Sequence, residues 1–114
     1  MGLYKTALQN LKAARKLVTK HWTTGELAID CKGNECKPKS PKAVSFCALG
    51  AVQRINGPGE RAAVTILAAA AAKWLKSRKK KTYGDTDDIF EVNDTYGQKA
   101  AIQMFDRAIR LARK

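Results

Sequence analysis

The sequence predicts a mainly helical protein: a compact bundle of about four helices with a short β-hairpin between the first and second helices. Three observations predict this class. The 114 residues fit a single domain, 1–114. A hydrophobic fraction of 45% is enough for a core. Apolar residues recur at helical spacing in four separate stretches. No apolar run approaches the roughly 20 residues of a membrane span and no signal-peptide core is visible, so we expect a cytoplasmic protein.

The first helix is expected from about Leu3 to His21, because apolar residues follow the helical period there. Lysines occupy the opposite side. They form either an ordinary solvated face or part of an anion-binding surface, since no acidic residue precedes Glu26 to balance them. The apolar stripe consists of Tyr4, Ala7, Leu8, Leu11, Ala14, Val18 and Trp22.

A β-hairpin is expected within residues 25–39, where the helical pattern stops. Leu27 and Ile29 alternate with polar residues, which is typical of a half-buried strand. Residues 32–34 read Lys-Gly-Asn, a turn signal, and residues 35–37 are the expected return strand. A two-stranded ribbon is marginal alone, so it must pack on the helices.

The second helix is expected from Ser40 to Ile55 and should lie at the centre of the bundle. Ser40 is a favourable N-cap and Pro41 fits the first helical position. Gly50 in mid-helix predicts close approach by another backbone segment. The expected buried face consists of Val44, Cys47, Ala48, Ala51, Val52 and Ile55.

The third helix is expected from about Gly59 to Ser77, after a turn at residues 56–59. Five consecutive alanines, residues 68–72, favour the helix and allow close packing. The turn, Asn-Gly-Pro-Gly, has two interpretations. It is either a plain helix–helix connection or a phosphate-binding loop at a helix N-terminus.

A charged loop is expected over about residues 78–94, followed by a last helix from Thr95 to Arg113. Six of the nine residues 73–81 are basic, whereas residues 82–94 hold five acids and no base. The acids either neutralise the basic run in space or leave it free to grip an anion. Asn93, Asp94 and Thr95 are candidate N-caps of the last helix. Its apolar stripe is Ala101, Ile102, Phe105, Ala108, Ile109 and Ala112.

Several short motifs together resemble a small uncharacterised domain family found in bacteriophages and actinobacteria. The motif-bearing residues are Trp22, Asp30, Phe46, Cys47, Gly50, Ala51, Asn93 and Asp94. Val92 stands where the family has Trp. The resemblance covers most of the chain and implies a shared fold without an established activity. A phage association implies a protein that blocks a host or defence component, acting in the host cytoplasm if phage-encoded.

The net charge of +12 and the pI of about 9.9 predict an anionic partner, either a nucleic acid, a nucleotide or an acidic protein surface. Tyr83 is the candidate stacking residue, because Trp74 falls on the core side of its helix. The candidate anion-binding residues are Arg54, Arg61, Lys73, Lys76, Arg78, Lys79, Lys80 and Lys81.

The cysteines offer two further chemistries. Cys31, Cys36 and Cys47 with His21 are zinc-type ligands, but they lack a second closely spaced pair, so we expect no metal and no cofactor. A Cys31–Cys36 disulfide would be disfavoured in a reducing cytosol. Cys47 with His21 could act as a nucleophile and base, although a lone Cys on an apolar face usually packs in a core.

From these observations we expect a non-enzymatic, phage-type binding or inhibitor protein that captures a phosphate-bearing partner, a nucleic acid or a nucleotide signal, through its basic surface. One alternative is an inhibitor that docks on an acidic surface of a host or defence protein. The other is a small Cys-dependent enzyme that uses Cys47 and His21. An oligomer is compatible with the Ala-rich third helix, which can pack within one chain or between two.

Overall fold

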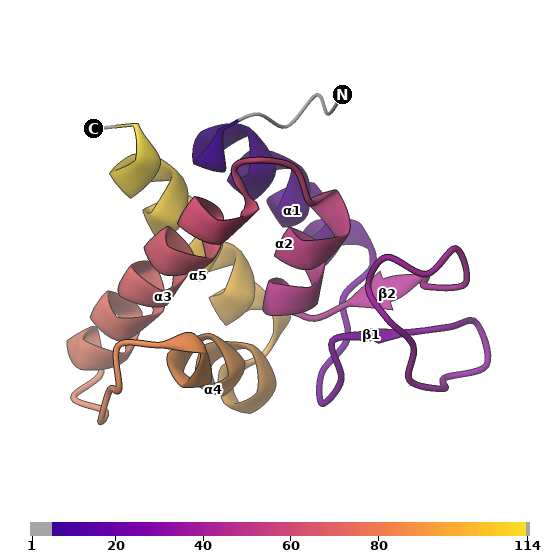
Figure 1. Cartoon of the computed structure of the whole chain (residues 1–114). Coiled ribbons are helices and arrows are strands. Elements are labelled where there is room, and N and C mark those ends of the chain that lie inside the picture. Colours follow the sequence, from indigo (N-terminus) through magenta and orange to yellow (C-terminus); the bar gives the residue numbers. More distant parts are fainter. Residues whose placement is uncertain (1–5, 114) are drawn as a thin grey trace.

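The computed structural model describes residues 6–113, and within them the chain forms five helices and a two-stranded antiparallel sheet. The mainly helical class is therefore confirmed, with one helix more than expected (Figure 1). The elements are α1 Ala7–Lys20, β1 Ala28–Ile29, β2 Ser45–Phe46, α2 Ala48–Ile55, α3 Glu60–Ser77, α4 Thr86–Tyr96 and α5 Gln98–Ala112. None of the described helices is both long and apolar enough to cross a membrane.

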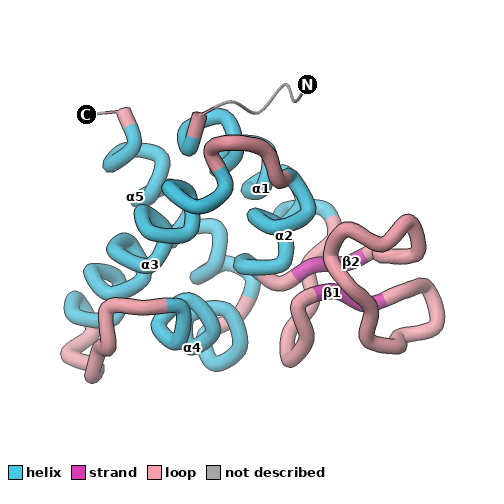
Figure 2. Tube along the Cα trace, in the orientation of Figure 1, coloured by secondary structure: helices cyan, strands magenta, loops and turns pink. Residues whose placement is uncertain are grey.

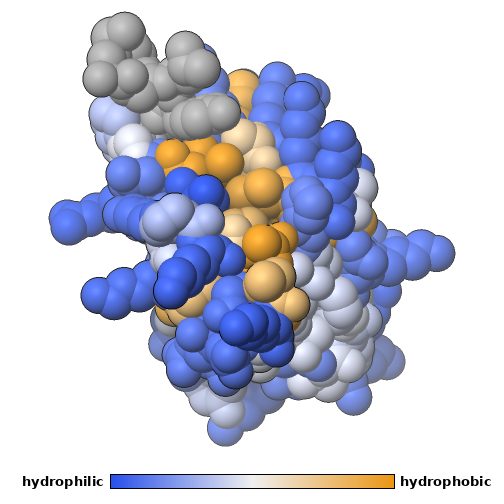
Figure 3. Space-filling model, turned by 90° about the vertical axis from the view of Figure 1, so that its right-hand side faces the viewer, coloured by the Kyte–Doolittle hydropathy of each residue, from blue (hydrophilic) through white to orange (hydrophobic). Residues whose placement is uncertain are grey.

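The longest helices form the body of the molecule, where α5 packs on both α1 and α3. Helix α2 packs on α1, and α4 packs on α3. The two short strands lie among long loops at one side of this body (Figure 2). Seen from that side, an apolar band crosses the surface between hydrophilic side chains (Figure 3). The largest fully buried apolar side chains are Phe105, Leu11, Leu67, Leu75, Ile89 and Met104.

Helix α1 begins where a capping box closes its first turn. The Thr6 hydroxyl accepts a hydrogen bond from the Gln9 backbone N–H, and the Gln9 side chain accepts one from the Thr6 N–H. Leu11, Ala14 and Val18 are buried as the period predicts. The expected positions Leu3 and Tyr4 lie outside the described residues.

The expected hairpin is only partly correct. Residues 30–34 do form a tight turn, and an isolated bridge joins Ile29 to Glu35. The sheet itself, however, pairs β1 with β2, so that Ala28 lies opposite Phe46 and Ile29 opposite Ser45. The strand partner therefore comes from the stretch that was expected to begin the second helix.

Helix α2 begins at Ala48, and the expected start at Ser40 is wrong. The Ser40 hydroxyl instead accepts from the Lys42 N–H in a turn, and Val44 is 43% exposed. The true N-cap is Cys47, whose sulfur accepts from the Gly50 N–H at 3.4 Å. Cysteine is not a usual N-cap, so the real start carried no signal while Ser-Pro supplied a misleading one.

Gly50 is approached by another backbone segment, as predicted. A Cβ built on it would lie 1.8 Å from the Leu27 carbonyl oxygen, so no larger residue fits without backbone movement. The Cys47 N–H donates to the same carbonyl at 3.2 Å. Residue 50 thus fixes how closely α2 lies against the segment before β1.

The acidic stretch is a helix, α4, so the expectation of a loop over residues 78–94 is wrong from residue 86 onward. The Asp85 carboxylate caps it by accepting from the Asp87 N–H at 2.9 Å. Acids in the first turn favour the positive end of the helix dipole. Asn93 is therefore interior to α4, and Gly97, with φ of 94°, separates α4 from α5.

Candidate functional site

Three arginines surround a surface pocket of about 260 Å³ between the C-terminal half of α3 and the face of α5. One of them, Arg78, follows the last turn of α3, and the other two lie on α5. The residues that line it are Trp74, Arg78, Gln103, Asp106, Arg107 and Arg110.

Helical spacing explains why these side chains meet. Gln103, Arg107 and Arg110 are separated by four and three residues, which places them on one face of α5. Trp74 and Arg78 are four residues apart at the C-terminal end of α3, where Arg78 is the C-cap. Because α3 and α5 pack side by side, the two faces form the walls of one pocket.

The Trp74 indole forms the fixed part of the pocket. It is only 4% exposed, and its N–H donates to Gln103 Oε1 at 3.0 Å. Tyr96 packs against it with 5.0 Å between ring centroids. The Arg78 guanidinium carbon lies 3.6 Å from the ring centroid, a cation–π contact that is worth about 0.5–1 kcal/mol at an exposed site.

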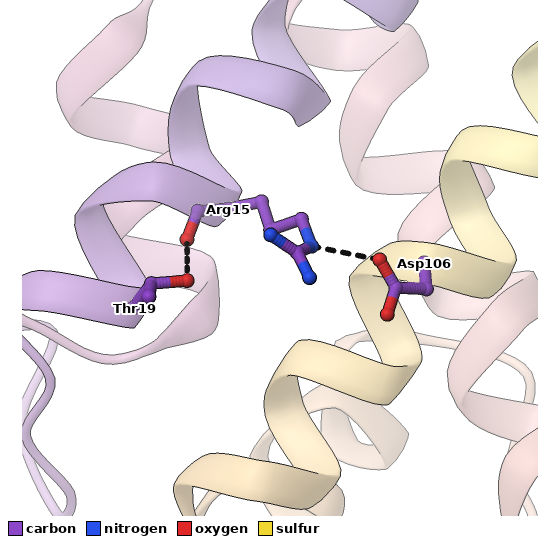
Figure 4. A network of polar contacts seen from close by, with 3 residues as sticks. All are labelled: Arg15, Thr19 and Asp106. Atoms are coloured by element: carbon purple, nitrogen blue, oxygen red, sulfur yellow. Dashed lines mark hydrogen bonds and ion pairs between the residues drawn. The ribbon is translucent and has the colours of Figure 1, made fainter.

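An ion pair neutralises the single carboxylate in this pocket. Arg15 of α1 reaches across to α5, and its Nε lies 2.7 Å from Asp106 Oδ1 (Figure 4). Thr19 donates to the Arg15 carbonyl one turn later. Within residues 6–113 no carboxylate lies within ion-pair distance of the three pocket arginines, so the pocket keeps their positive charge.

Within residues 6–113, the acids of residues 85–94 are not paired with the basic run of residues 73–81, and backbone groups bind two of them. Both carboxylate oxygens of the buried Asp88 accept from the N–H groups of Tyr83 and Gly84. Asp85 caps α4. Across the described part of the chain, no ion pair joins residues 73–81 to residues 85–94.

The structure separates the expected anion-binding residues into different places. Arg54 is turned inward, where it donates to the carbonyls of Pro38 and Ser40 at 3.1 and 2.7 Å. Arg61 is exposed on the first turn of α3, roughly 25 Å along the helix from Arg78. Of the eight residues expected to bind an anion, only Arg78 lines the pocket. The exposed lysines of residues 73–81 add positive charge at the end of α3 and in the loop after it, and they are Lys73, Lys76, Lys79, Lys80 and Lys81.

Tyr83 is 62% exposed, with the Lys81 Nζ 5.3 Å from its ring centroid. The residues that sequence reasoning missed are the arginines of α5. Arg107 and Arg110 have an explanation as favourable charges near a helix C-terminus. One sequence pattern could have pointed to them. Trp74 and Arg78 are four residues apart, and so are Gln103 and Arg107, so each pair is expected on one face of its helix.

The motif residues of the resemblance meet at a second place, a buried junction around Asn93. Its Oδ1 accepts from the Trp22 indole N–H at 2.9 Å and from the Ala48 N–H at 3.0 Å. Its Nδ2 donates to the Thr23 carbonyl and to Asp94 Oδ1. The amide thus joins the segment after α1, the start of α2 and α4. Asp30 lies apart, in the turn that its carboxylate closes.

Cys47 lies beside this junction and is 1% exposed. Burial raises the pKa of its thiol, which opposes formation of the nucleophilic thiolate. His21 is exposed at the end of α1, and within the described residues no hydrogen bond joins its side chain to Cys47. Cys31 and Cys36 are free thiols. In the described part of the chain no three His, Cys, Asp or Glu side chains are grouped to hold a metal ion.

A smaller cavity of about 160 Å³ opens next to Cys47 and carries carboxylates rather than arginines. The negative charge of Glu35 raises the pKa of Glu26 at its mouth. Asp94 accepts from the Gly25 N–H in the same region. The cavity is lined by Gly25, Glu26, Leu27, Glu35, Cys47, Phe90 and Asp94.

Comparison with known proteins gives a family and no activity. No curated protein and no solved structure matches the chain. A family model does match, over residues 3–111, which is nearly the whole sequence. The chain therefore belongs to the family of unknown function DUF6197.

Proposed function

We propose that this protein is a binding protein that captures a phosphate-bearing partner in the pocket between α3 and α5. The observation that carries the proposal is the gathering of Arg78, Arg107 and Arg110 around one concavity, with no carboxylate of residues 6–113 paired to them. The arginine fork matches phosphate geometry in a bidentate manner, which a surface lysine does not.

The overall charge supports the same proposal. The chain carries +12, and the exposed lysines of residues 73–81 adjoin the pocket through Arg78. A positive surface of this kind attracts anions over distance and raises their association rate. The lysines would supply steering and salt-dependent affinity, whereas the pocket would supply the specific contact.

The shape of the site favours a phosphate group over an acidic protein surface. A pocket of about 260 Å³ admits a small group. A stable protein interface instead needs roughly 800 Å² on each partner. Docking on an acidic host or defence protein would use the same side chains, so it is retained as an outcome of the test.

The test is calorimetric titration of the full chain at about 50 mM and 200 mM salt with mononucleotides, cyclic nucleotides and a short 5′-phosphorylated DNA strand. Arg107→Ala and Arg110→Ala should each weaken phosphate binding about tenfold. Lys42→Ala is the matched control, because Lys42 is exposed in the loop between β1 and β2 and does not line the pocket. It removes one positive charge as well and should change affinity little.

Equal losses for Arg110→Ala and Lys42→Ala would show unspecific attraction by net charge and would overturn the pocket. If no phosphate-bearing ligand binds, and if an acidic protein binds in a manner that depends on Arg107 and Arg110, the docking alternative replaces the proposal.

A further inference from the structure

We infer that the ligand group is a nucleotide, with its base stacked on Trp74 in the place now held by Arg78 and its phosphate on Arg107 and Arg110. The inference rests on the proposed function and specifies what the same pocket recognises. A free nucleotide and the phosphorylated end of a strand share this chemistry.

Arg78 covers one face of the Trp74 ring. Its guanidinium carbon lies 3.6 Å from the ring centroid, which is a direct contact with that face. Arg78 is exposed and follows the last turn of α3, so its side chain can leave the ring. The indole is held in place by Gln103, and it would offer the same surface to a planar base.

The base and phosphate sites are spaced along α5. Gln103 marks the edge of the indole, and Arg107 follows it by four residues, about 6 Å along the helix axis. Arg110 follows by seven residues, about 10 Å. The base platform and the phosphate-binding arginines are therefore separated by one to two helical turns, a gap that the sugar of a nucleotide would bridge.

The size and the charge of the pocket limit what it can bind. Its volume of about 260 Å³ is just below the roughly 300–1,000 Å³ usual for small-molecule sites, so the pocket can take no more than one nucleotide. Arg78, once displaced from the ring, still lines the pocket and adds to its positive charge. The Arg15 pair keeps Asp106 from repelling that phosphate at full strength.

The experiment compares AMP with ribose 5-phosphate by calorimetry and by quenching of tryptophan fluorescence. AMP should bind at least tenfold more tightly and should quench fluorescence, while ribose 5-phosphate should not quench. Arg78→Met should preserve or increase the preference for AMP, because it removes the competitor for the ring. Trp74→Phe should reduce the preference while leaving ribose 5-phosphate binding intact, and Trp74→Leu should abolish it.

Thermal unfolding shows whether the Trp74 variants fold. If they do not fold, the surface variant Arg78→Met still tests the inference. Equal affinity for AMP and ribose 5-phosphate, still dependent on Arg107, would overturn the nucleotide inference and leave the phosphate proposal standing. Loss of all binding, or binding indifferent to Arg107 and Arg110, would overturn both.

A pentanucleotide with and without a 5′ phosphate separates the two sources of the group. Tighter binding of the phosphorylated strand than of AMP identifies a strand end, and tighter binding of AMP identifies a free nucleotide. Equal binding of the two strands, both tighter than AMP, would mean recognition of internal backbone and would overturn the inference.

Discussion

The Trp22 indole N–H donates to Asn93 Oδ1 at 2.9 Å, across 71 positions of the chain. The same oxygen accepts from the Ala48 N–H, and the amide nitrogen donates twice. All the hydrogen-bonding capacity of one buried amide is thereby used. Three segments that pack at the end of the helical body are held in register by this side chain.

Asn93→Leu should lower the free energy of unfolding by about 2–3 kcal/mol, because it leaves the buried Ala48 N–H and the partly buried Trp22 N–H and Thr23 carbonyl without their partner, at about 1 kcal/mol or more each. Chemical denaturation measures the loss. Asn34→Ala, at an exposed turn, is the control and should cost little. A loss below 1 kcal/mol for Asn93→Leu would mean that water replaces the amide.

Asp106→Asn should tighten phosphate binding by roughly fivefold at low salt, since it removes the one carboxylate of the pocket and releases Arg15. Stability should fall by no more than about 1 kcal/mol, because both side chains are partly exposed. Titration at 50 mM and 500 mM salt measures the effect, which should nearly vanish at the higher concentration. Unchanged affinity at low salt would count against the pocket.

The three thiols should react with a disulfide reagent at distinct rates. Cys31 is exposed and should react first, Cys36 is partly buried, and Cys47 is buried with a raised pKa. Cys47 should react only as fast as the protein opens, and denaturant should remove the difference. Mass spectrometry of labelled peptides assigns each rate. Fast labelling of native Cys47 at neutral pH would favour the Cys-dependent enzyme.

Glu35→Gln should raise the melting temperature at pH 7 and have no such effect near pH 3. Glu35 raises the pKa of Glu26 in the folded protein, so the folded state holds that proton more tightly than the unfolded chain does. The stabilising contribution of Glu26 is therefore fully present at pH values below the usual pKa of Glu, and it is lost as the pH rises through the raised pKa. Thermal unfolding at both pH values in low salt measures the gain. An equal gain at both would point to a cause other than charge.

Gly50→Ala should destabilise the protein by more than about 2 kcal/mol, although alanine is the better helix former by about 1 kcal/mol. The added Cβ would overlap the Leu27 carbonyl. Calorimetric unfolding measures the change, and Ala69→Gly, exposed on α3, serves as the control for helix propensity alone. An increase in stability would contradict the close approach of these backbones.

Helical periodicity predicted α1 and α3 well, because each has a continuous apolar stripe. It failed at α2, where the strand β2 runs directly into the helix and both are apolar. It failed again at α4, where acids that looked like a loop stabilise a helix start. At β2 the deciding partner, β1, is distant in sequence, whereas at α4 the deciding contacts of Asp85 and Asp88 are local.

The candidate site was predictable only in part. Arg78 was expected from the basic run, and the position of Trp74 on the core side was also correct. Arg107 and Arg110 were not found, since nothing local says that α5 will lie beside the end of α3. Arg54 was misleading because a charged residue can be held by backbone carbonyls. Pockets between helices depend on packing that single-sequence patterns do not encode.

The segment between α1 and α2, residues 21–47, contains only two strands of two residues each. Its backbone hydrogen bonds lie mostly within the segment itself. Its attachment to the helical body uses the Asn93 amide, Asp94, the Arg54 guanidinium and the contact at Gly50. This segment should therefore open as a unit with a low local free energy, ahead of global unfolding. Amide hydrogens there would exchange with solvent while those of α3 and α5 remain protected. The segment would thus unfold locally while the helical core stays folded.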